Sequence, residues 1–180
     1  MIEEIQAWCE GKVWWWRLLL LAGLAYIGIT AAVNPQGWSV FGGVTLGIHE
    51  LGHFLFRALG EFMGVAGGTI AQLAAPIICI VMFVRQGDYF APVLGGVWLA
   101  TSLANVSVYI ADATRLELPL VSVGGGEVMH DWEYMLSSLN ILSSADNLAR
   151  LVAFLGYAVL FVSLAYGGWT IYLMAKSKNI

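Results

Sequence analysis

The residues best suited by type and spacing to support chemistry form one short run, His49 to His53, with the sequence His-Glu-Leu-Gly-His. On a helix, positions four residues apart lie on one face, with Cβ atoms about 5–6 Å apart. Two imidazole nitrogens in that arrangement can bind one zinc ion, each at about 2.0–2.1 Å. Glu50 follows the first histidine directly, so its carboxylate can take a proton from a metal-bound water. The pattern predicts one Zn²⁺ per chain, with His49 and His53 as ligands and Glu50 as general base.

A catalytic zinc site needs at least one further protein ligand. The remaining histidine is His130, and the carboxylate candidates are Asp112, Asp131 and Glu61. Asp112 ends an expected helix and His130 lies in the loop that follows it, so both would lie at the same end of the bundle as the motif. The sequence does not choose between Asp112 and His130, and we predict both as metal ligands.

Two polar residues are expected to support this site. Asp131 is placed to orient His130 through the second ring nitrogen of the imidazole, as carboxylates commonly do beside metal ligands. Gln72 lies inside an apolar run, where it would hydrogen-bond a substrate or a neighbouring helix. Glu61 is interpreted as a charge at a helix terminus.

The composition is that of a membrane protein. Of 180 residues, 59% are apolar and 11% are charged, against about 45–50% and about 25% in soluble domains. The mean hydropathy is +0.78. The net charge is −4, and the absence of a basic patch argues against nucleic acid as a partner.

The apolar runs predict an all-α, polytopic membrane helix bundle forming one integral domain, residues 1–180. About five spanning helices are expected, with a loop and a short interfacial helix at 113–147; the spans are about 13–33, 38–60, 62–84, 89–111 and 148–174. The second span carries the histidine motif on one face and Gly43 and Gly47 on the other, where we expect close packing on a neighbouring helix.

Five crossings would place the metal site and the N-terminus on the same side of the membrane. That side would hold more Lys and Arg than the other, which weakly favours a cytoplasmic N-terminus. We expect an integral protein of the bacterial inner (plasma) membrane. Its partners would be the lipid bilayer and a membrane-embedded peptide or lipid substrate, and an oligomer is compatible with the sequence.

The order of these features resembles the site-2 protease family of intramembrane zinc metalloproteases over about residues 38–112. In that family an HExxH helix is followed by one helix and then by another with an Asn-x-x-Pro-x-x-x-x-Asp-Gly motif. Here Asn105 precedes Asp112 by seven residues, one fewer than in the family motif, and Ala113 replaces the Gly. The resemblance implies Asp112 as third zinc ligand, Glu50 as general base, and a peptide substrate within the membrane.

The sequence therefore predicts a zinc-dependent intramembrane hydrolase, first of all a site-2 protease-like metalloprotease. Two alternatives stay open. One is a hydrolase of membrane lipid amides or esters with the same metal chemistry. The other is a non-enzymatic metal-binding membrane protein, which would tolerate loss of the Glu50 carboxylate, whereas a hydrolase would keep its metal and lose turnover.

Overall fold

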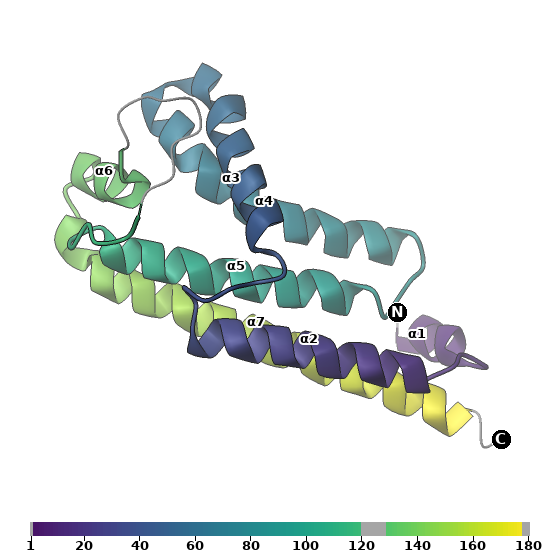
Figure 1. Cartoon of the computed structure of the whole chain (residues 1–180). Coiled ribbons are helices and arrows are strands. Elements are labelled where there is room, and N and C mark those ends of the chain that lie inside the picture. Colours follow the sequence, from purple (N-terminus) through teal and green to yellow (C-terminus); the bar gives the residue numbers. More distant parts are fainter. Residues whose placement is uncertain (1, 120–128, 178–180) are drawn as a thin grey trace.

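Helices are the only regular secondary structure in the part of the chain that the structure describes. This computed structural model describes residues 2–119 and 129–177 (Figure 1). Its helices in chain order are α1 (Ile2–Cys9), α2 (Trp15–Val33), α3 (Gly42–Phe56), η1 (Arg57–Leu59), α4 (Glu61–Arg85), α5 (Pro92–Asp112), α6 (Asp131–Ser138), η2 (Leu142–Ser144) and α7 (Ala145–Ser177). The expected all-α fold is confirmed. Part of the loop expected at 113–147, residues 120–128, lies outside the described residues.

Four helical segments in the described ranges are long and apolar enough to cross a membrane. They are Trp15–Val33, Glu61–Arg85, Pro92–Asp112 and Leu142–Ser177. An integral membrane protein is therefore supported, but the expected count of about five spanning helices is not confirmed.

The segment at 38–60, expected to be a spanning helix, is not among these four. Its helix α3 has 15 residues, which gives about 22 Å at about 1.5 Å per residue, against about 30 Å of hydrocarbon. After η1 the chain turns at Gly60, whose φ of 104° lies in the region that favours glycine,. Hydropathy reports how apolar a segment is, not whether its path crosses the bilayer.

The connector between α2 and α3 folds back along the bundle (Figure 1). At its end Phe41 stacks on Trp98 of α5, with ring centroids 5.7 Å apart. Trp98 Nε1 also donates a hydrogen bond of 2.9 Å to Thr45 Oγ1. Gln36 and Ser39 of this connector line a cavity, and a cavity wall is where non-helical backbone is tolerated at membrane depth.

The connector folds back from the end of α2, and α3 then runs toward the end of the bundle that holds α6 (Figure 1). The metal site and the N-terminus, expected at the same end, therefore lie at different ends. The beginning of α5 and the end of α7 lie near the N-terminus, and Ser177 Oγ donates a hydrogen bond of 3.4 Å to the Cys9 carbonyl. The end of α5, α6 and the beginning of α7 lie at the opposite end of the bundle (Figure 1). The histidine motif belongs to this second end, not to the end of the N-terminus.

Glycines set the packing of α3. A Cβ at Gly52 would collide with the carbonyl oxygen of Gly67 on α4, so these two helices touch backbone to backbone. The close packing expected at Gly43 and Gly47 is not found among residues 2–119 and 129–177, where a Cβ at either position would meet no atom within 4 Å. The contact face of α3 is thus the face that also carries the histidines.

Candidate metal centre

Two histidines of α3 meet an aspartate at the beginning of α6. The Nε2 atom of His49 lies 3.0 Å from Oδ2 of Asp131, and the Nε2 atom of His53 lies 3.3 Å from the same oxygen. One ligand atom from each residue lies within 4.8 Å of the others. His49 and Asp131 are buried and His53 is partly exposed. The three side chains could therefore hold one metal ion.

Hydrogen bonds fix both imidazoles in the form that binds a metal through Nε2. The Nδ1 atom of His49 lies 3.0 Å from the side-chain oxygen of Gln72, and Nδ1 of His53 lies 2.9 Å from the carbonyl oxygen of Gly64. Both partners only accept, so each Nδ1 carries the proton and donates it. Each Nε2 therefore faces Asp131: when protonated it donates to the carboxylate, and when deprotonated it offers its lone pair to a metal ion, with Nδ1 held as in most metal-binding histidines,.

Gln72 is itself anchored on α5. Its side-chain amide donates to Asn105 Oδ1 at 3.2 Å and toward the carbonyl oxygen of Ser102 at 3.4 Å. With donors and acceptor both engaged, the amide cannot rotate without breaking contacts. The orientation of the His49 ring is therefore tied to the central helix of the bundle.

Gly68 of α4 leaves the space that an ion needs. A Cβ at this position would lie 2.6 Å from Nε2 of His49 and 2.6 Å from Nε2 of His53. Any side chain here would push against both ligand atoms. The glycine gives a hollow beside two converging imidazole nitrogens, which fits a metal ion about 2.0–2.1 Å from each.

The same contacts set the charges of the groups. Hydrogen bonding to Asp131 raises the pKa of His53 to about 9, although partial burial opposes the shift. Burial by itself would raise the pKa of Asp131, but the hydrogen bonds from His49 and His53 hold it below its usual value. Asp131 is therefore ionised at neutral pH and carries the negative charge that a cation between two imidazoles requires.

The two residues predicted as further ligands lie elsewhere and contact each other. His130 Nε2 is 3.3 Å from Asp112 Oδ2. The Asp112 carboxylate also accepts backbone hydrogen bonds from Glu117 at 3.0 Å and Leu118 at 3.1 Å. His130 Nδ1 accepts the backbone N–H of Glu133 at 3.2 Å and so caps the N-terminus of α6. Neither residue belongs to the group that could hold a metal among the described residues.

The sequence predicted His130 as a metal ligand and Asp131 as the residue that orients it, whereas the structure places Asp131 beside His49 and His53 and places His130 against Asp112. His130 and Asp131 stand at the beginning of a short helix, where neighbouring side chains point in different directions. The capping role takes His130 away from the histidine pair and leaves Asp131 facing it. The positions of Gly64, Gly68 and Tyr109 were also missed, and no local pattern in the sequence marks them.

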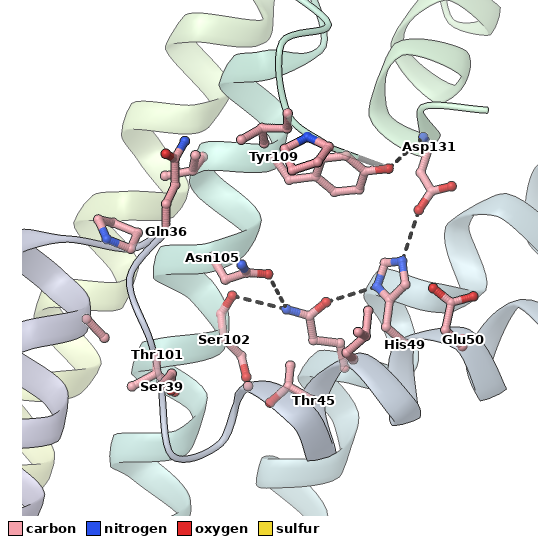
Figure 2. Close-up of a pocket in the computed structure, with 18 of the residues that line it drawn as sticks. Gln36, Ser39, Thr45, His49, Glu50, Thr101, Ser102, Asn105, Tyr109 and Asp131 are labelled. Carbon is pink, nitrogen blue, oxygen red and sulfur yellow. Dashed lines mark hydrogen bonds and ion pairs between the residues drawn. The ribbon is translucent and has the colours of Figure 1, made fainter. Parts of the chain in front are cut away.

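A cavity of about 690 Å³ opens beside the three groups. Glu50 lines it together with His49, His53 and Asp131, and Figure 2 shows the Glu50 carboxylate next to His49 at the same wall. Glu50 is half-buried. A carboxylate in this place can reach a water molecule or a substrate group bound in the cavity.

One wall of the cavity carries hydrogen-bonding groups. Thr101, Ser102 and Asn105 of α5 line it, and Thr45 lines it from α3 (Figure 2). The Ser102 hydroxyl is buried and has no hydrogen-bond partner among the described residues. An unpaired buried hydroxyl costs free energy, so this wall suits water or a polar ligand.

Comparison with known proteins gives no match: no family model, no curated protein and no solved structure is similar to this chain.

Proposed function

We propose that the chain is a zinc-dependent membrane hydrolase, and first of all a peptidase of the site-2 protease-like kind. The observation that carries the proposal is the convergence of two Nε2 atoms and the Asp131 carboxylate beside a cavity that Glu50 lines. Catalytic zinc sites combine three protein ligands with one open position. Imidazole with carboxylate makes zinc the default metal.

Zinc in such a site would act as a Lewis acid that polarises a carbonyl group and makes water a nucleophile near neutral pH. Glu50 would accept the proton of the attacking water and then deliver it to the leaving group. Gln72 and the Gly64 carbonyl would hold the proton of each imidazole on Nδ1, so that Nε2 is the atom that binds the metal. Gly68 keeps the ligand atoms accessible.

The polar wall favours a peptide over an acyl chain. A methylene chain against Ser102 and Asn105 would leave their hydrogen-bonding groups unpaired, whereas a locally unwound peptide offers N–H and C=O groups to them. Asn105 and Tyr109 lie seven and three residues before the end of α5 at Asp112, about 10 Å and about 5 Å along the helix. The scissile bond would then lie within about two turns of the membrane surface at this end.

The test uses the purified protein in liposomes containing total bacterial membrane protein and lipid. We expect new peptide termini from the wild type, and a loss of at least about 100-fold in Glu50→Gln because only the base is removed. Glu10→Gln removes a carboxylate at the far end of the bundle and should behave as wild type. Equal release of termini by wild type and Glu50→Gln would refute Glu50 as the base and, with it, the proposed mechanism.

One observation keeps the lipid hydrolase as a second candidate. The site lies near the helix ends, a depth at which the ester and amide linkages of lipids are found. Mass spectrometry of the same liposomes decides between the two substrates. Glu50-dependent release of fatty acid without new peptide termini would replace the peptidase by the lipid hydrolase.

A further inference from the structure

The last turn of α5 contacts His130, the N-cap of α6, and Asp131, the first residue of α6. The Tyr109 hydroxyl accepts the backbone N–H of Asp131 at 3.2 Å (Figure 2), and the Tyr109 ring lies 4.3 Å from the His130 ring between centroids. One turn further on, Asp112 Oδ2 lies 3.3 Å from His130 Nε2. The backbone of Asp131 is thus hydrogen-bonded to α5, while its carboxylate points to the histidines of α3.

The protonation of His130 follows from its cap. Its Nδ1 accepts the N–H of Glu133, so in the neutral ring the proton must be on Nε2, facing Asp112. The contact is one of opposite charge or dipole rather than an aligned hydrogen bond. His130 is 5% exposed and Asp112 is 6% exposed, and such a buried pair is costly unless both partners are present.

We propose that Asp112 and His130 are positioning residues that hold Asp131 as the third metal ligand. Asp112, fixed by the backbone N–H groups of residues 117 and 118, sets the place of the His130 ring. The His130 ring in turn sets the first turn of α6, from which the Asp131 carboxylate projects. The proposal rests on the metal centre of the proposed function, but not on any particular reaction.

The geometry suggests variants that separate this role from folding. In His130→Asn the amide oxygen can still cap α6, because asparagine is a good N-cap residue, but the shorter side chain no longer reaches Asp112. Asp112→Asn keeps the size of the side chain and removes its charge. Asp88→Asn is the matched control, since Asp88 accepts the backbone N–H groups of Phe90 and Ala91 at 2.9 Å each at the other end of α5.

The experiment measures zinc affinity by chelator competition, and the visible absorption of bound Co²⁺, on detergent-purified full-length protein. We expect a 10–100-fold loss of affinity in Asp112→Asn and in His130→Asn, the range found for residues that support metal ligands. The Co²⁺ spectrum should shift toward that of Asp131→Ala, because the third ligand is displaced. A change in stability alone would not move this spectrum. Asp88→Asn should leave both readouts unchanged.

The double variant Asp112→Asn/His130→Asn should lose no more affinity than the worse single variant, because both act through one contact. Additive losses, or wild-type affinity and spectrum in both single variants, would overturn the positioning role. Loss of binding in either single variant with full binding in Asp131→Ala would make Asp112 or His130 a ligand instead. No metal in the wild type would remove the metal centre itself, and the proposed function with it.

Discussion

The most specific prediction concerns Gly68, because a methyl group on its Cα would collide with the ligand atoms of both histidines. In Gly68→Ala the new Cβ would lie 2.6 Å from each Nε2 atom, whereas ordinary contacts begin at 3.4 Å, so each ring must retreat by about 0.8 Å. Metal–ligand distances tolerate only about 0.2 Å. A displacement about four times larger should weaken zinc binding at least about 100-fold, or about 2.8 kcal/mol.

The assay is chelator competition on detergent-purified protein, with circular dichroism to verify the helix content. Gly47→Ala is the matched control: it adds the same methyl group to the neighbouring helix α3, at a position where none of the described residues comes within 4 Å of the new Cβ. We expect the control to bind zinc as wild type does. A folded Gly68→Ala variant with wild-type zinc affinity would refute the assignment of the metal position between the two Nε2 atoms.

Of four further predictions, three concern the metal site and one concerns the contact between α3 and α4. His49→Ala/His53→Ala should bind no zinc, and stoichiometric zinc in this variant would reject the site. Zinc at 100 times its Kd should stabilise the wild type by about 2.7 kcal/mol, and equal stabilisation of the double variant would place the ion elsewhere. Gln72→Leu removes the acceptor of His49 Nδ1 and should cost 10–100-fold in zinc affinity; unchanged affinity would show that this hydrogen bond does not position the ring. Gly52→Ala should destabilise the α3–α4 contact by about 1–3 kcal/mol in thermal unfolding, and a stability within about 0.5 kcal/mol of Gly47→Ala would contradict the backbone contact.

The path of the chain through the membrane was only partly accessible from the sequence. The apolar run at 38–60 has the length and composition of a span, yet it contains a back-folded connector and the 15-residue helix α3. Contacts with distant residues decide this path: Trp98 of α5 binds Thr45, and the backbone of Gly52 meets Gly67. Such contacts leave no periodic pattern in the segment itself.

The features that could be inferred from the sequence are local ones. Composition marks a helical membrane protein, and the spacing of His49 and His53 places both imidazoles and Glu50 within about one turn of one helix, whatever surrounds it. Which residue joins the two histidines depends on tertiary structure. The expected topology brought three candidates to the same end of the bundle as the histidines: Asp112, His130 and Asp131. The packing of α6 on α5 pairs the first two with each other and turns Asp131 toward the histidines. The helical repeat fixes neighbours four residues apart, while the meeting of residues about 80 apart depends on how whole helices pack.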